Sequence, residues 1–226
     1  MLRTEPTDRA VEWPTILLLL ATYGLWALGT TALWSFSPVL AVILTRRNGD
    51  GHQVLMGQRG AAAVFMPSKY VFPGGAVDAG DDHAAPLPLS TECARRLALS
   101  APPGPLVAAA LRELHEETGL SLRADRPSLH FVFRAITPPG RSRRFDARFF
   151  LADAADVTGD ATDFRDASDE LSHLHWIGLA EARALDLPFI TEVVLAEVTN
   201  LCAGGSQPGV PFFDNSGDVP TFRRID

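Results

Sequence analysis

The hydrophobic pattern divides the chain into an apolar N-terminal stretch and a longer region of short alternating elements. No charged residue occurs from Trp13 to Thr45, and residues 15–34 are long enough to cross a bilayer core of roughly 30 Å. Trp13 and Trp34 stand near the two ends of this stretch, where membrane spans concentrate their aromatic residues. We therefore expect residues 1–35 to hold an apolar helix that spans or associates with a membrane.

Two other interpretations of the apolar stretch stay open: a helix packed on the following domain, or a translation start placed too far upstream. A cleaved signal peptide agrees less well with the sequence, because no A-x-A cleavage site follows the apolar run. The orientation of a span is not predicted, because acidic residues accompany the two arginines that precede the run.

Beyond the apolar stretch, residues 36–226 show the shorter hydrophobic periods of one folded domain. The pattern predicts strands at 39–45, 53–57, 129–136, 144–152 and 174–177. It predicts helices at 91–99, 105–118, 179–185 and 189–201, and a terminal hairpin that turns at 215–217. This alternation of strands and helices indicates a domain of the α/β or α+β class.

Composition removes several classes of protein. The apolar fraction of 46% is ordinary for a chain that buries a core. The net charge of -7 is unlike that of proteins whose main task is to grip a nucleic-acid backbone, so no nucleic-acid partner is expected. Two cysteines outside any C-x-x-C pair exclude a disulfide scaffold and a cysteine-rich zinc site.

The segment with the clearest chemistry runs from Arg112 to Leu120, at the end of the helix predicted at 105–118. Residues three and four apart share one face of a helix, so Glu113, Glu116 and Glu117 point the same way. Three neighbouring carboxylates repel one another unless a cation lies between them. The segment therefore predicts a site for a hard, oxygen-preferring cation such as Mg²⁺ or Mn²⁺.

This segment resembles the box of the Nudix hydrolases, Gly-x5-Glu-x7-Arg-Glu-U-x-Glu-Glu-x-Gly-U, in which U is apolar. Its second half matches at every specified position from Arg112 to Leu120. In the first half Gly75 is followed by Asp81, where the family has Glu, and residues 82–111 replace the short x7 spacer. The insertion and the Phe-Pro-Gly-Gly loop at 72–75 are similar to the branch that includes peroxisomal coenzyme A diphosphatases. The resemblance implies an α/β/α sandwich with a mixed sheet.

The resemblance also implies roles for individual residues. Glu116 and Glu117 are expected as the main metal ligands, and Glu113 as a ligand or base, with Arg112 fixing one of the carboxylates. The carbonyl of Gly74 or Gly75 is expected to complete the metal shell, and Asp81 to assist through water. Two acids are candidates for the general base, Glu170 and its neighbour Asp169.

Arg59, Arg143 and Arg144 are candidates for holding an anionic substrate, with Gly74 and Asp81 at the same place, because guanidinium forks match phosphate geometry. Arg59 falls at the spacing of the coenzyme A branch, whereas Val64 and Ser68 depart from that branch's Arg and Gly. Coenzyme A is therefore one candidate substrate among several.

We expect a pyrophosphohydrolase that uses Mg²⁺ or Mn²⁺ to cleave the diphosphate bond of a small nucleotide-type substrate. Its catalytic domain would face the cytoplasm, with residues 15–34 in the membrane; without such a span the protein would be cytoplasmic. The alternatives are a Nudix-fold module that binds a nucleotide without cleaving it, and a membrane-interaction scaffold. The insertion at 82–104 is either a substrate-selecting lid or a tolerated surface insertion. The oligomeric state is not predicted.

Overall fold

The computed structural model describes residues 36–63, 66–82, 87–123, 125–141 and 143–226. The apolar helix expected within residues 1–35 lies outside the described residues, and so does Val64. In the described ranges, no helix combines the length and the apolar character that a bilayer crossing requires.

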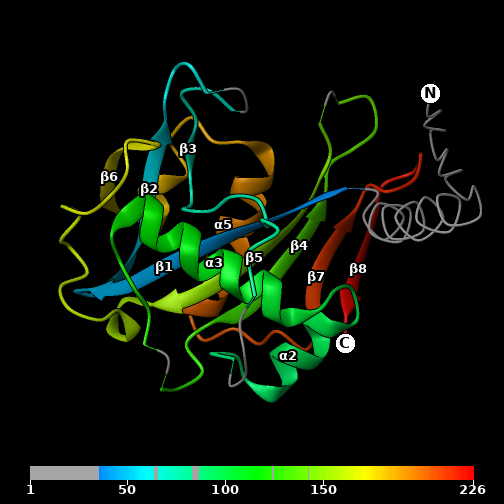
Figure 1. The fold of residues 1–226 in the computed structure, drawn as a ribbon, viewed down its shortest axis with the longest axis horizontal. Coiled ribbons are helices and arrows are strands. Elements are labelled where there is room, and N and C mark those ends of the chain that lie inside the picture. The colour runs from blue at the N-terminus through cyan, green and yellow to red at the C-terminus, as the bar shows by residue number, and fades with distance from the viewer. Residues whose placement is uncertain (1–35, 64–65, 83–86, 124, 142) are drawn as a thin grey trace, which may run out of the picture. The chain divides into compact units, whose positions relative to one another are not determined.

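Eight strands of the described residues form one mixed sheet, with helices on both of its faces (Figure 1). The strands are β1 (Ser37–Asn48), β2 (Gly51–Arg59), β3 (Tyr70–Val71), β4 (His130–Ile136), β5 (Phe145–Asp153), β6 (Leu171–Gly178), β7 (Val210–Asp214) and β8 (Thr221–Ile225). The helices are α2 (Thr91–Ala98), α3 (Pro103–Thr118), α4 (Leu179–Ala182) and α5 (Phe189–Cys202), with a 3-10 turn η1 (Ala154–Asp156). The expected mixed sheet with helices is confirmed.

The sheet is mixed because it combines two parallel strand pairs with several antiparallel pairs. The strand order is β3-β2-β1-β5-β4-β7-β8, and β6 pairs with β2. β1 runs parallel to β5 and β4 runs parallel to β7, whereas β1–β2, β4–β5, β2–β6 and β7–β8 are antiparallel. In Figure 1, α3 crosses one face of the sheet and α5 lies behind the other.

The apolar positions of β1 alternate between the two faces and so join both halves of the core. Ile43 belongs to the cluster that packs under α4 and α5, together with Phe149 of β5 and Val194 of α5. Its neighbours Val42 and Leu44 are equally buried, with 0% exposure. A central strand buried on both faces explains the nearly continuous apolar run at 39–45.

Several element boundaries differ from the sequence expectation, and three of the differences have a clear physical cause. α3 begins at Pro103, two residues earlier than expected. Proline fits a first helical turn because the N–H groups of that turn have no partner within the helix, so the missing N–H is not needed. β1 and β2 are longer than the strands expected at 39–45 and 53–57, since Arg46–Asn48 continue the β1 ladder and leave a two-residue turn in which Gly49 has a φ of 60°. β6 is longer than the expected 174–177 because a bulge lets its first residues continue the pairing.

The described part of the insertion at 82–104 is built into the domain. Its helix α2 is capped by Ser90, whose hydroxyl accepts the N–H of Cys93, and it places Leu97 at 0% exposure. The N–H groups of Ser128 and Leu129 donate to the carbonyl of Pro88, which ties the insertion to the start of β4. These contacts are those of a structural element, and they favour neither a lid nor a loosely tolerated loop.

This packing predicts that Leu97→Ala lowers the free energy of unfolding by about 2–5 kcal/mol, because the substitution opens a cavity under α2. The matched control is Leu99→Ala in the same segment, since Leu99 is 64% exposed. Chemical denaturation of the two variants checks the prediction. Equal stability of the two would show that α2 does not contribute to the core.

Candidate active site

The candidate site gathers around the last two turns of α3 and the loop that follows β3. Gly119 ends the helix in the left-handed conformation, with a φ of 75°, and its N–H donates to the carbonyl of His115. This confirms the expected helix end and fixes the direction in which the preceding glutamates leave the helix. Glu113 and Glu117 are turned inward, whereas the side chain of Glu116 is 55% exposed.

Glu117 is the most unusual residue of the site, because it is an acid with only 1% exposure. Its Oε2 accepts the N–H of Gly74 at 2.7 Å. Among the described residues, its Oε1 is buried without any hydrogen-bond partner. Burial is the main cause that raises the pKa of Glu117 to about 8, and the negative charge of Glu113 adds to it.

The loop 73–76 presses against both β1 and α3, which explains its two glycines. The Leu40 N–H donates to the carbonyl of Gly75 at 2.8 Å, and Val42 donates to Pro73. A side chain at Gly74 would overlap the backbone of Leu40, while a side chain at Gly75 would overlap the carboxylate of Glu113. Within the described residues, no hydrogen bond engages the Gly74 carbonyl, whereas the Gly75 carbonyl has only one lone pair left.

These two glycines are expected to respond differently to the same substitution. Gly74→Ala should lower the free energy of unfolding by more than about 2 kcal/mol, because rigid backbone blocks the new methyl group. Gly75→Ala should leave the melting temperature nearly unchanged, since only the flexible end of Glu113 must move, but it should displace that carboxylate. Calorimetry and a turnover assay check both. Gly80→Ala is the control, as Gly80 has open space around it.

Arg112 holds together the acids that surround it. Its Nε and Nη2 form a fork on Asp81 at 2.9 Å each, and its Nη1 donates to Glu113 at 2.8 Å and to Glu116 at 3.1 Å. The hydrogen bonds from Arg112 hold the pKa of Asp81 below its usual value. Burial nevertheless raises the pKa of Glu113, so the guanidinium does not fully replace a cation there.

Arg112 also explains why the carboxylates do not form a ready-made ligand set. Within the described residues, no group of three or more His, Cys, Asp or Glu side chains is arranged to hold a metal ion as it stands. Glu113 and Glu116 are turned towards the Arg112 guanidinium, and Glu117 towards the Gly74 N–H. Glu117 nevertheless has an unpartnered carboxylate oxygen, and the neighbouring Glu113 has a raised pKa. Carboxylate oxygens of this kind are the ligands that a hard cation prefers.

Two further charged residues reach this group from the β2–β6 edge. Arg59 ends β2, and its Nε is buried without a hydrogen-bond partner among the described residues. Its charge, like the hydrogen bond from Gly74, lowers the pKa of Glu117 and so opposes the effect of burial. Glu170 precedes β6, and its charge raises the pKa of both Glu113 and Glu117. Asp169, the other candidate base, is exposed beside it, and the choice between the two acids stays a prediction.

The other two arginine candidates lie elsewhere. Arg144 donates to the carbonyls of Thr137, Asn215 and Ser216, and its guanidinium stacks on Phe36 at 4.4 Å from the ring centre. Arg143 is exposed. Among the described residues, no hydrogen bond or ion pair joins Arg143 or Arg144 to the carboxylates of α3. Arg144 therefore ties the β4–β5 loop to the C-terminal hairpin.

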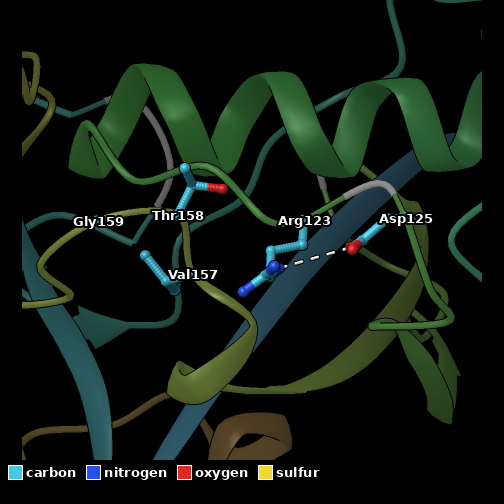
Figure 2. Close-up of a pocket in the computed structure, with 5 residues that line it drawn as sticks. All are labelled: Arg123, Asp125, Val157, Thr158 and Gly159. Atoms are coloured by element: carbon cyan, nitrogen blue, oxygen red, sulfur yellow. Dashed lines mark ion pairs between the residues drawn. The ribbon is translucent and has the colours of Figure 1, made fainter.

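Figure 2 shows a hollow of about 500 Å³ that is separate from this group of charges. Its lining consists of Arg123, Asp125, Val157, Thr158 and Gly159. Arg123 and Asp125 form an ion pair across it at 3.5 Å. None of the α3 carboxylates lines this hollow, so it is not part of the candidate site.

Comparison with known proteins agrees with the sequence pattern. Residues 103–198 match the model of the NUDIX domain family. The match begins at residue 103, so Gly74, Gly75 and Asp81 lie outside the matched range, and only their geometry places them at the site. The comparison with curated proteins found no match.

Solved structures share the fold at low sequence identity. A NUDIX hydrolase from Alicyclobacillus acidocaldarius is 22% identical, with a TM-score of 0.57, and the alignment covers 73% of this chain and 91% of that chain. The NUDIX domain of Shewanella oneidensis NrtR, complexed with ADP ribose, is 15% identical with a TM-score of 0.53, and the alignment covers 74% and 89%. The chain therefore has the Nudix fold, and its residues 103–198 match the model of the NUDIX domain family.

Proposed function

We propose that the chain is a divalent-metal-dependent hydrolase that cleaves the diphosphate bond of a nucleotide-type substrate. The observation that carries the proposal is the carboxylate of Glu117, buried beside the equally inward-facing Glu113 with one oxygen unpartnered among the described residues. A buried carboxylate with one unpartnered oxygen destabilises the fold, and such groups are found mainly at active sites.

Glu113, Glu116 and Glu117 would hold Mg²⁺ or Mn²⁺, with the Gly74 carbonyl as the backbone ligand. The free carbonyl favours Gly74 over Gly75, which already accepts the Leu40 N–H. When bound, such an ion neutralises phosphate charge and lowers the pKa of a coordinated water. Arg112 would then keep its fork on Asp81 and release the glutamates, so that Asp81 acts by positioning Arg112 rather than by touching substrate.

The remaining roles follow from position. Arg59, beside Glu117 with a buried and unused Nε, would bind a phosphate oxygen of the substrate. Glu170 would accept the proton of the attacking water as general base, because its charge acts on both Glu113 and Glu117 and Arg112 does not engage it. Glu170 is exposed, which leaves it open to solvent and substrate.

A second candidate function is nucleotide binding without cleavage. It is favoured by Arg112, which engages Asp81, Glu113 and Glu116 together and so competes with a cation. The NUDIX domain of NrtR, whose structure holds ADP ribose, shares this fold. Thermal stabilisation by a nucleotide without any product would distinguish this function from hydrolysis.

The substrate experiment uses the full chain, purified in mild detergent, with Mg²⁺, with Mn²⁺ and with a chelator. The panel contains coenzyme A and its thioesters, ADP-ribose, NADH, dinucleoside polyphosphates and nucleotide sugars, with products identified by mass spectrometry. We expect cleavage of one class, only with metal, at the diphosphate bond. A folded protein that cleaves none of them would overturn the proposed activity. Coenzyme A is a weaker candidate, because Val64 and Ser68 stand where the coenzyme A branch has Arg and Gly.

We further propose that residues 15–34 anchor the catalytic domain at a membrane, with the domain on the cytoplasmic side. The proposal rests on the uncharged run of the sequence and on its length. Retention of the full chain in membranes washed with alkaline carbonate is the expected result. Complete release into the wash would contradict an anchor.

A further inference from the structure

An irregularity in the β2–β6 ladder lies directly beside the candidate site. From Gln53 to Met56, β2 pairs with β6 in one register, with Met56 opposite His175. From Gln58 onward the register changes, so that Gln58 lies opposite Ser172 and Arg59 opposite Leu171. Gly57 therefore faces two residues of β6, which is a β-bulge with one extra residue.

The bulge contains a residue in an unfavourable backbone conformation. His173 has a φ of 51°, in the left-handed region that costs a non-glycine residue roughly 1–2 kcal/mol. His175 Nδ1–H donates to the His173 carbonyl at 2.6 Å, and the Ser172 hydroxyl donates to the Gln58 carbonyl at 3.0 Å. The side chain of His173 is exposed. Its contribution to the bulge therefore comes from its backbone conformation and not from side-chain packing.

The bulge changes the face of the sheet towards which the first side chains of β6 point. In a regular strand, Leu171 and Leu174 would point to opposite faces, because side chains alternate. Here both reach the same point, since a side chain at Gly57 would meet Leu171 Cβ at 2.9 Å and Leu174 Cδ2 at 3.1 Å. Without the extra residue, Ser172 would take the place of Leu171 opposite Arg59.

Glu170 is placed by two contacts on either side of it. Upstream, the Ser168 N–H donates at 2.8 Å to the carbonyl of Glu116, one of the three glutamates proposed to bind the metal. Downstream, Leu171 pairs with Arg59 and is 4% exposed. A shift of β6 by one residue would break the second contact and move Glu170 along the edge of the sheet.

We propose that the bulge at His173 is a positioning device, which sets the β6 register so that Glu170 lies over the α3 carboxylates. His173 is a positioning residue in this account and touches no substrate. The inference rests on the proposed function for its catalytic consequence, whereas the register itself is independent of any activity. A bulge beside a reactive group is a recurrent means of directing a side chain.

The test compares four substitutions in the full chain. His173→Gly and His173→Asn accept a left-handed φ, whereas His173→Val resists it strongly and His173→Ala moderately. The register is read by disulfide formation between Gln58→Cys and Ser172→Cys, in a background where Cys93 and Cys202 are alanine. Directly opposed strand residues lie about 4.5–5.5 Å apart, within disulfide reach.

We expect His173→Val to slow disulfide formation and to lower kcat by at least about 10-fold with little change in KM, because a displaced general base affects the chemical step. His173→Gly and His173→Asn should behave as the parent in both assays. If His173→Val does not fold, His173→Ala carries the same comparison.

Equal disulfide rates in all variants would overturn the inference, and so would a loss of kcat in His173→Gly, which would assign the effect to the imidazole. Absence of turnover in the parent would contradict the proposed function instead. In that case the disulfide rates still decide whether His173 sets the register.

Discussion

Glu117→Gln is expected to lower turnover by at least about 100-fold, since even the outer partners of metal ligands cost 10–100-fold when removed. The amide keeps an oxygen that accepts the Gly74 N–H, so the loop 73–76 should keep its place. What is lost is the negative charge that a divalent cation requires. The measurement is the metal-dependent rate on whichever diphosphate the panel identifies.

Glu192→Gln is the matched control, because Glu192 is an exposed acid in the first turn of α5 on the other face of the sheet. It makes the same chemical change without touching the site, and its turnover should equal that of the parent. If Glu117→Gln retained the parent rate under the same conditions, Glu117 would not be a metal ligand.

In the absence of metal, the carboxyl group of Glu117 should also make the free energy of unfolding depend strongly on pH. The pKa of Glu117 is about 8 in the folded protein, against an ordinary value of 4.5. Below pH 4.5 the group is protonated in both states. As the pH rises towards 8 the unfolded chain releases this proton and the folded chain retains it, so the free energy of unfolding falls. The loss attributable to this group is on the order of a few kcal/mol.

Denaturant titrations from pH 5 to pH 8.5 in a chelator should show this decline in the parent. Glu117→Gln should lack most of it and should therefore be more stable than the parent at high pH, although it is inactive. Added Mg²⁺ should restore stability to the parent only. Parallel curves for the two proteins would mean that burial does not hold the Glu117 proton.

Much of the fold follows from the sequence because its periodicities are strong. The helix at 105–118 and the strands at 129–136 and 144–152 reappear as α3, β4 and β5 within two residues at either end. β6 was expected to be shorter, because its bulge interrupts the alternation on which strand prediction depends. A single residue with a positive φ, such as His173, leaves no signal in a hydropathy pattern.

Part of the candidate site can be predicted from residue spacing in the sequence, and part requires the tertiary structure. Helical spacing places Glu113 and Glu117 together, but only the tertiary structure shows that Glu117 is buried and that Arg112 engages its neighbours. Arg59 and Arg144 are alike as letters in a sequence. The structure separates them, because one ends a strand beside Glu117 and the other fixes a loop to the C-terminal hairpin.

If the inward-facing glutamates of α3 form a divalent-metal site, the metal-free full chain should bind Mn²⁺. We would titrate it with Mn²⁺, follow the free ion by electron paramagnetic resonance, and use Mg²⁺ as competitor. We expect saturable Mn²⁺ binding that Mg²⁺ displaces, that Glu192→Gln retains and that Glu117→Gln loses. Equal Mn²⁺ binding by Glu117→Gln and the parent would contradict a metal site at these glutamates.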